Sequence, residues 1–199
     1  MDFTVQNTLV PENVRFLCGT DEAGRGPLAG DVYAAAVILP DGYIPSGLND
    51  SKKLSEKKRE ALFDEICENA VSYAIATATP KEIDEINILN ASLLAMRRAI
   101  VALSSSPDYL LVDGNIYRGF DLPGRAVVKG DALIPAIAAA SILAKVARDR
   151  SLVELDRLYP EYHFAKHKGY PTELHREMVL KYGPSPVHRM SFLKKILPQ

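Results

Sequence analysis

The chain lacks tryptophan, and only two of its 199 residues are cysteines, Cys18 and Cys67. Nothing in their spacing pairs the two thiols, so we expect reduced cysteines in a cytoplasmic protein. An excess of charge of either sign is also missing, because 24 Lys and Arg residues face 25 Asp and Glu residues, for a net charge of -1. Without a global field that attracts polyanions, binding to one would require a local basic patch.

Long hydrophobic runs are missing as well. No stretch approaches the roughly 18 to 20 apolar residues that a membrane span needs, and residues 1–15 carry charged and polar groups where a signal peptide has an apolar region. We therefore expect a protein that is neither membrane-bound nor exported. The composition is 47% hydrophobic, enough at this length to bury the core of one domain. We expect that domain to be a monomer.

The spacing of apolar residues predicts alternating strands and helices. Short apolar or alternating runs predict five strands, at residues 15–20, 32–39, 71–75, 109–113 and 126–129. Helical spacing predicts helices from a cap at Ser55 to Asn69, from a capping box at Thr79 to near residues 104–107, and over residues 135–158. Shorter helices are expected in the tail. This alternation is typical of an α/β sheet with helices on its faces.

The motif with the most chemical content is Asp21-Glu22-Ala23-Gly24-Arg25-Gly26. Carboxylates suit a hard divalent cation, whereas backbone N–H groups near glycines and a guanidinium suit a phosphate or hydroxyl oxygen. Neighbouring side chains on a regular strand point to opposite faces, so both carboxylates serve one metal only if the strand ends at Asp21 and the glycines turn Glu22 around. Phosphoryl chemistry and simple turn capping both remain open.

Two further carboxylates, Asp113 and Asp131, adjoin glycines after apolar runs. Each alone is better explained as a turn residue, although burying a carboxylate there is costly unless a cation or hydrogen bonds compensate it. If they converge with Asp21 and Glu22, the four can hold two Mg²⁺ or Mn²⁺ ions about 3.5 to 4 Å apart, which favours nuclease chemistry. Zinc is disfavoured, because the four histidines lie in the C-terminal quarter, away from both cysteines.

Basic residues form local clusters that suit phosphate contacts. The candidates are Lys52, Lys53, Lys145, Arg148, Lys166 and Lys168. Phosphate contacts set affinity and register without reading bases, so binding should weaken steeply with salt and depend little on sequence. We interpret Asp149 as the ion-pair partner of a nearby arginine on its helix.

Six separated motifs together resemble those of ribonuclease HII, the type 2 ribonuclease H family. In chain order they are residues 21–30, Asn49-Asp50-Ser51-Lys52-Lys53-Leu54, Val112-Asp113-Gly114, Val128-Lys129-Gly130-Asp131, residues 139–146 and His167-Lys168-Gly169-Tyr170. The resemblance implies an α/β, RNase H-like fold with a mixed five-stranded sheet flanked by helices over residues 1–160. It also implies a C-terminal helical segment, residues 161–199, that packs on this domain and contributes to substrate binding.

The implied activity is that of an endonuclease on nucleic acid. It hydrolyses the RNA strand of RNA–DNA hybrids and cuts 5' of ribonucleotides embedded in duplex DNA, leaving 5'-phosphate and 3'-hydroxyl ends through two divalent ions. By motif, Asp21, Glu22 and Asp113 match the metal ligands of the family. Asp131 matches its fourth active-site carboxylate. The turn that recognises the 2'-hydroxyl matches Gly24, Arg25 and Gly26, assisted by Tyr170.

One departure from the family pattern is Asp31, which follows Gly30 where an uncharged residue is usual. We expect it to be exposed at the start of a strand. Its charge would affect only how readily a phosphate approaches or a cation binds, and would leave the class of reaction unchanged. Two alternatives stay open: an RNase H-like nuclease directed at DNA, and a non-catalytic hybrid-binding module. Four intact carboxylates speak against the second, because binding a polyanion favours removing negative charge.

Overall fold

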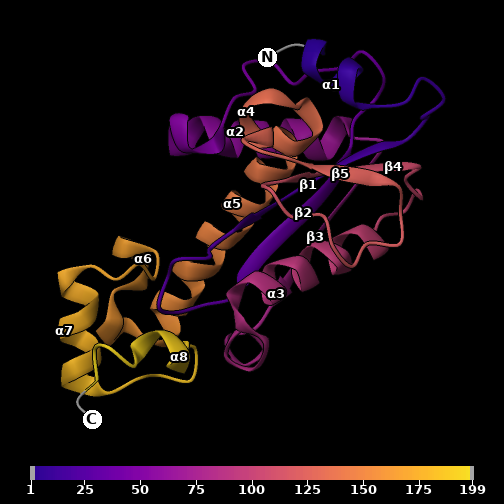
Figure 1. Ribbon diagram of the computed structural model, residues 1–199. Coiled ribbons are helices and arrows are strands. Elements are labelled where there is room, and N and C mark those ends of the chain that lie inside the picture. Colours follow the sequence, from indigo (N-terminus) through magenta and orange to yellow (C-terminus); the bar gives the residue numbers. More distant parts are fainter. Residues whose placement is uncertain (1–2, 198–199) are drawn as a thin grey trace.

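The computed structural model describes residues 3–197, and a single five-stranded sheet lies at its centre (Figure 1). The strands are β1 (Leu17–Ala23), β2 (Val32–Ile38), β3 (Ser72–Ala78), β4 (Tyr109–Asp113) and β5 (Gly124–Val127). In the sheet order β3-β2-β1-β4-β5, β1 pairs antiparallel with β2 and parallel with β4. The mixed five-stranded sheet expected from the sequence is confirmed.

Long helices cover both faces of this sheet. Helix α3 (Pro80–Val101) packs on one face, and α5 (Pro135–Leu158), with α2 (Glu56–Asn69) beside it, packs on the other. The short helices of the main body are α1 (Thr4–Leu9), η1 (Ser51–Lys53) and α4 (Gly130–Leu133). Across residues 3–197, no helix combines the length and apolar character needed to cross a membrane.

The C-terminal segment lies at the far end of α5 from the N-terminus (Figure 1). It contains η2 (Pro160–Tyr162), α6 (Phe164–His167), α7 (Glu173–Tyr182) and α8 (Met190–Leu193). A separate apolar cluster joins this segment to the main body, because Leu28 and Leu152 pack with Phe164, Val179 and Leu193. The loop that follows β1 is therefore held from the C-terminal side.

Local signals account for the starts of the long helices. The Ser55 hydroxyl accepts a hydrogen bond from the Lys58 N–H, and Thr79 and Glu82 form the reciprocal capping box before Pro80. Helix α5 begins at Pro135, where the fixed φ of proline suits a first helical turn. These predicted starts, and the predicted end of α5, are confirmed.

Three strands differ from the sequence prediction. Strand β1 extends to Ala23, and β5 ends at Val127, after which Lys129 adopts a left-handed φ of 57° at the start of α4. On β3 the small residues face the core and Tyr73 is exposed, because α3 packs closely against this strand. Helices α1 and α4 were not expected.

Candidate active site

Two carboxylates lie together where β1 and β4 run side by side. The parallel register places Thr20 opposite Val112, so Asp21 and Asp113 follow at the same level of the sheet. Asp21 is only 5% exposed. Burial raises the pKa of the Asp21 carboxyl well above its ordinary value, and the charges of Glu22 and Asp113 raise it further. A carboxylate in such a place is costly unless a cation compensates it.

Glu22 lies on the opposite face of β1 from Asp21. The strand does not end at Asp21, which was the condition for the glycines to turn Glu22 around, because Asp21 and Glu22 both pair with β2, opposite Ala35 and Ala34. Side chains alternate along the strand, so Asp21 faces α5 while Glu22 faces α3. Glu22 nevertheless lines two cavities, one of about 60 Å³ with Asp113 and one of about 300 Å³ with Asp21. It therefore lies at the boundary between the two faces.

An arginine of the same motif pairs with Glu22. The guanidinium of Arg25 lies 3.2 Å from the Glu22 carboxylate. Burial raises the pKa of Glu22, the Arg25 charge lowers it, and the charge of Asp113 raises it again, so that the pKa remains above its ordinary value. The pair keeps a cation next to the carboxylates on an exposed turn.

Asp131 joins the cluster from the short helix α4. The Asp131 N–H donates to Asp113 Oδ1 at 3.3 Å, and Lys52 Nζ lies 3.5 Å from Asp131 Oδ2. Burial and the Asp131 charge raise the pKa of Asp113, against backbone N–H groups and the Lys52 charge, which lower it. Burial lowers the pKa of Lys52, but the charges of Asp131, Asp21 and Asp50 raise it above its ordinary value. Lys52 thus offsets part of a concentrated negative charge.

The Gly24–Gly26 turn closes the other side of the 300 Å³ cavity. Gly24 has a φ of 98°, and a Cβ built on it would lie 2.6 Å from Arg148 Cδ and closer still to Nε. A Cβ on Gly26 would lie 3.7 Å from the ring of Tyr170. The cavity of about 300 Å³ is lined by Asp21, Glu22, Ala23, Gly24, Arg25, Gly26, Ser51, Lys52, Ser141, Lys145, Arg148 and Tyr170. Carboxylates and turn therefore share one space.

The donor set suits a hard cation. Within residues 3–197, no three His, Cys, Asp or Glu side chains are grouped closely enough to hold one ion by themselves. Mg²⁺ usually takes only one or two carboxylates and completes its shell with water and substrate phosphates. The neighbouring pairs Asp21 with Asp113 and Asp113 with Asp131 fit that mode, and their crowded negative charge favours a divalent ion.

Comparison with known proteins decides the family. The family model described as Ribonuclease HII matches residues 18–195. A ribonuclease HII from Marinomonas sp. (strain MWYL1) is 62% identical over 184 residues, covering 91% of this chain and 92% of that protein. The chain belongs to the ribonuclease HII family. A ribonuclease HII from Caldicellulosiruptor saccharolyticus is 53% identical over 195 residues, covering 98% of this chain and 95% of that protein.

A solved structure agrees with this assignment. The crystal structure of ribonuclease H2 from Pyrococcus horikoshii OT3 matches with a TM-score of 0.75 at 30% identity, covering 92% of this chain and 97% of that chain. Ribonuclease HII enzymes are metal-dependent endoribonucleases with ribonuclease H activity on RNA–DNA hybrids. The expectation of an RNase H-like, metal-dependent hydrolase is therefore confirmed.

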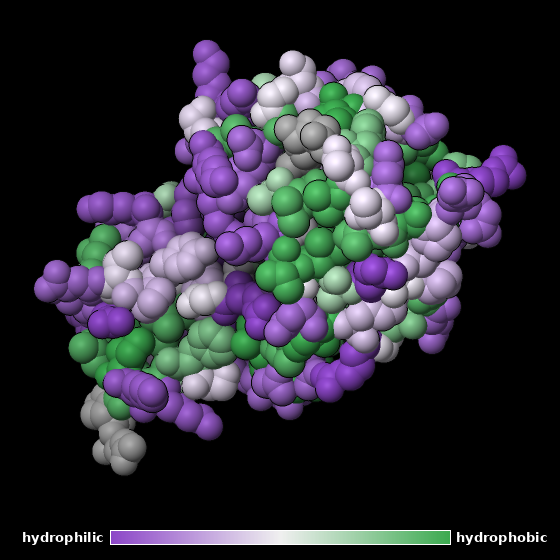
Figure 2. All heavy atoms as spheres, turned by 45° about the horizontal axis from the view of Figure 1, so that its top comes forward, coloured by the Kyte–Doolittle hydropathy of each residue, from purple (hydrophilic) through white to green (hydrophobic). Residues whose placement is uncertain are grey.

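Most residues that the ribonuclease HII motifs single out line the 300 Å³ cavity. Asp113 and Asp131 adjoin it, whereas the side chains of Lys53 and Lys168 do not line it. Lys168 instead contributes its carbonyl, which accepts from Arg148 NH2 at 2.7 Å. On the face shown in Figure 2, hydrophilic residues gather where the main body meets the C-terminal segment.

Several basic and acidic residues lie differently from expectation. Arg148 was expected to contact phosphate from the surface, but it is fully buried beneath the turn. Asp149 pairs with a nearby arginine as expected, Arg148 at 3.8 Å, but its nearer partner is Lys145 at 2.7 Å. Asp31 is half-buried, not exposed, and burial raises its pKa.

Sequence reasoning gave no role to two serines beside Asp21. The hydroxyls of Ser51 and Ser141 lie 3.0 Å apart and line the cavity. Ser141 is a lone hydroxyl in an alanine-rich run of α5, and that is the signal that would have found it. Its hydroxyl helps to lower the otherwise raised pKa of Asp21.

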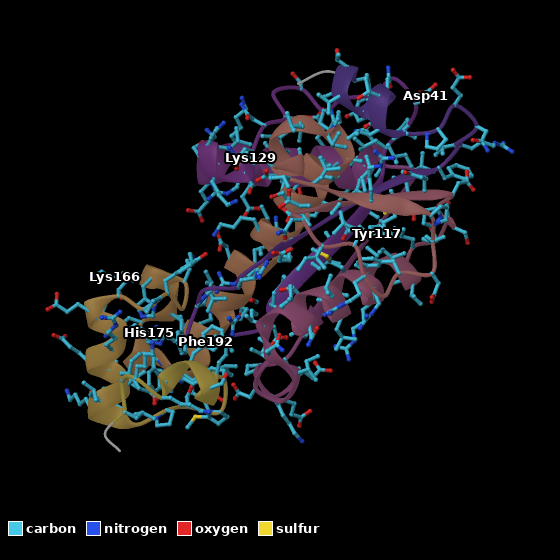
Figure 3. All side chains as sticks on the ribbon, viewed as in Figure 1. Asp41, Tyr117, Lys129, Lys166, His175 and Phe192 are labelled. Atoms are coloured by element: carbon cyan, nitrogen blue, oxygen red, sulfur yellow. The ribbon has the colours of Figure 1, made fainter. Side chains whose placement is uncertain are left out.

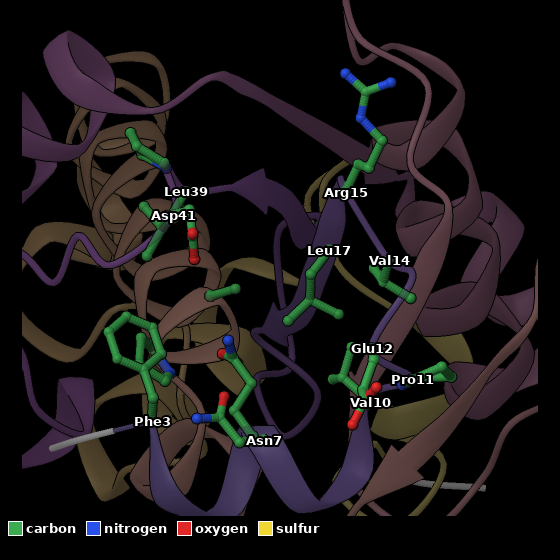
Figure 4. Close-up of a pocket in the computed structure, with 14 residues that line it drawn as sticks. Phe3, Asn7, Val10, Pro11, Glu12, Val14, Arg15, Leu17, Leu39 and Asp41 are labelled. Carbon is green, nitrogen blue, oxygen red and sulfur yellow. The ribbon is translucent and has the colours of Figure 1, made fainter.

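A larger cavity lies elsewhere and contains none of the expected site residues. It measures about 580 Å³ and opens between α1, the chain after β2 and the start of α5, with Phe3, Asn7 and Asp41 on its walls (Figure 4). Cavity size alone would thus point away from the carboxylates.

Gly24→Ala should lower cleavage by about 100-fold, the usual cost of displacing a positioned group by about 1 Å. The new methyl group would collide with Arg148. In addition, the backbone at position 24 would have to keep a φ of 98°, which L-residues avoid. The measurement is kcat/KM on an RNA–DNA hybrid. Gly42→Ala is the matched control, because Gly42 also has a positive φ, 68°, but has no atom within 4 Å of the added Cβ. Equal losses in both variants would show that the collision is unimportant.

Proposed function

We propose that this protein cuts duplex DNA on the 5' side of an embedded ribonucleotide, in addition to the RNA strand of RNA–DNA hybrids. One observation carries the proposal: the cavity that holds Asp21 and Glu22 also holds the Gly24–Gly26 side of the turn and Tyr170. Carboxylates that can hold catalytic metal ions and groups that can recognise a sugar therefore line the same cavity.

The turn and the tyrosine suit recognition of a 2'-hydroxyl. Arg25 and Gly26 are exposed, and within residues 3–197 their backbone N–H groups donate no hydrogen bond. Tyr170 is exposed on the same cavity and carries a hydroxyl that can donate or accept. The 2'-hydroxyl also donates and accepts and is missing from DNA, so these groups can distinguish the sugars without reading bases.

The carboxylates would hold the divalent ions, Mg²⁺ or Mn²⁺, through Asp21, Glu22, Asp113 and Asp131. Ions so bound lower the pKa of a water and stabilise a departing oxygen, which supports products with a 5'-phosphate and a 3'-hydroxyl. Lys52 and Lys145 place positive charge on the cavity wall, where substrate phosphates would approach. Each lysine also pairs with a carboxylate, Lys52 with Asp131 at 3.5 Å and Lys145 with Asp149 at 2.7 Å.

A cleavage map tests the proposal. The substrates are a duplex with one ribonucleotide, the identical all-DNA duplex and an RNA–DNA hybrid, each with Mg²⁺, Mn²⁺ or chelator. We expect one cut 5' of the ribonucleotide, no cut in the all-DNA duplex and no activity in chelator. Equal cleavage of the all-DNA duplex would favour a DNA nuclease, and binding without any cleavage would favour a non-catalytic module.

A further inference from the structure

A buried arginine from the C-terminal segment holds the loop after β1, which contains the Gly24–Gly26 turn. Arg189 has no exposed surface, and its guanidinium donates to four backbone carbonyls of the loop after β1. The distances are 2.7 Å to Gly24, 3.1 Å to Arg25, 2.9 Å to Pro27 and 2.9 Å to Gly30. One side chain thus fixes a loop that lies some 160 positions earlier in the chain.

The backbone around Arg189 is anchored independently. The Arg189 N–H donates to the Leu28 carbonyl at 2.8 Å, and the Asp84 carboxylate accepts from the N–H groups of Met190 and Ser191, each at 2.9 Å. The guanidinium lies over the ring of Phe192, 5.3 Å from its centroid, and Figure 3 places Phe192 in the C-terminal segment. The arginine therefore approaches the turn from a fixed base.

The pattern of these hydrogen bonds orients the turn. The carbonyls of Gly24, Arg25 and Pro27 point inward to Arg189, whereas the N–H groups of Arg25 and Gly26 have no partner in the described chain. A second buried guanidinium, Arg148, packs under Gly24. Burial and the Arg148 charge lower the pKa of Arg189 to about 9, which still leaves it charged at neutral pH. Two cations behind the turn favour an electron-rich oxygen in front of it.

We propose that Arg189 is a positioning residue for ribonucleotide recognition, which keeps the carbonyls of the turn inward and its N–H groups toward the substrate. Only a planar guanidinium has enough donors in a fixed fork to satisfy four carbonyls, and a lysine ammonium has three donors on a flexible stem. The inference rests on the proposed function, because it concerns how the 2'-hydroxyl is distinguished.

Arg189→Lys tests this role through binding as well as cleavage. In chelator, the ratio of affinities for a duplex with one ribonucleotide and for the matched all-DNA duplex should fall by roughly five- to tenfold, the loss of about one hydrogen bond. Affinity for the all-DNA duplex should stay unchanged, and with metal kcat should fall more than KM rises. A wild-type protein that binds both duplexes equally and cuts neither would overturn the proposed function together with this inference. A wild-type preference that Arg189→Lys retains in full would overturn the role of Arg189 alone.

Two further variants separate positioning from stability. Val179→Ala removes buried methyl groups from the same segment without altering a polar contact of the turn, so it should lower the Tm and leave the affinity ratio unchanged. Asp84→Ala removes the anchor of the segment that carries Arg189 and should lower the ratio in the same direction, by a smaller factor. If Arg189→Lys does not fold, Asp84→Ala decides: an unchanged ratio in that variant would contradict the proposal.

Discussion

Asp113→Asn should reduce cleavage by at least about 1,000-fold, or roughly 4 kcal/mol of transition-state stabilisation, while hybrid binding stays equal or improves. Asp113 lies between Asp21 and Asp131 in the cluster, so one amide removes an anionic oxygen that both proposed metal-binding pairs share. Binding should not suffer, because the cavity loses negative charge next to substrate phosphates. The same change should raise the free energy of unfolding at neutral pH, since burial and Asp131 disfavour the charged carboxylate.

Single-turnover rates with Mg²⁺, affinities in chelator and urea unfolding together test this prediction. Asp41→Asn is the matched control: Asp41 is exposed and lines the other cavity, whose lining includes none of the four carboxylates (Figure 4). It should leave all three measurements unchanged. Turnover close to wild type in Asp113→Asn would rule out the metal-binding role of Asp113.

Features set by neighbouring residues were predictable from the sequence. Helix caps depend on three or four consecutive residues, so the starts of α2, α3 and α5 followed from Ser55, Thr79 and Pro135. Asp113 was placed correctly at the carboxyl end of a strand, because an apolar run followed by Asp-Gly marks both the strand and its end. The boundary of β5 was missed, because Val128 has high β propensity and yet lies beyond the last residue paired with β4.

Features set by distant residues were not predictable. Arg189 resembles any solvated tail arginine until the loop carbonyls, remote in sequence, surround it. The glycines could have turned Glu22 around if the strand had ended at Asp21, but pairing with β2 keeps Glu22 in regular strand geometry. Arg148 looked like a surface cation of α5, but Gly24 and residues 168–170 pack against its side chain and bury it. In each case a partner far along the chain decides the environment.

The buried histidines show the same dependence on distant partners. His175 Nδ1 lies 2.9 Å from the Tyr170 carbonyl and must donate to it, which leaves Nε2 to accept from His188 Nε2–H at 3.0 Å. His188 Nδ1 then accepts from the Ser185 N–H at 2.9 Å. All of these hydrogen bonds form only when both imidazole rings are neutral. Figure 3 places His175 inside the C-terminal segment. Burial lowers the pKa of each histidine to about 4; the charge of His167 lowers that of His175 further, and the charge of His175 lowers that of His188.

Acid should therefore destabilise the C-terminal segment through these rings. Between pH 6.5 and 4 the unfolded chain protonates each histidine while the folded chain does not. The free energy of unfolding therefore decreases as the pH is lowered, by about 3 kcal/mol for one histidine. The raised pKa values of Asp21 and Asp113 act in the opposite direction, so the quantity to measure is the difference in unfolding free energy between wild type and His188→Asn. That difference should shrink by about 3 kcal/mol from pH 7 to pH 4, because the variant lacks the titrating ring. A difference that is independent of pH would mean that His188 is protonated in the folded protein and that the neutral network is incorrect.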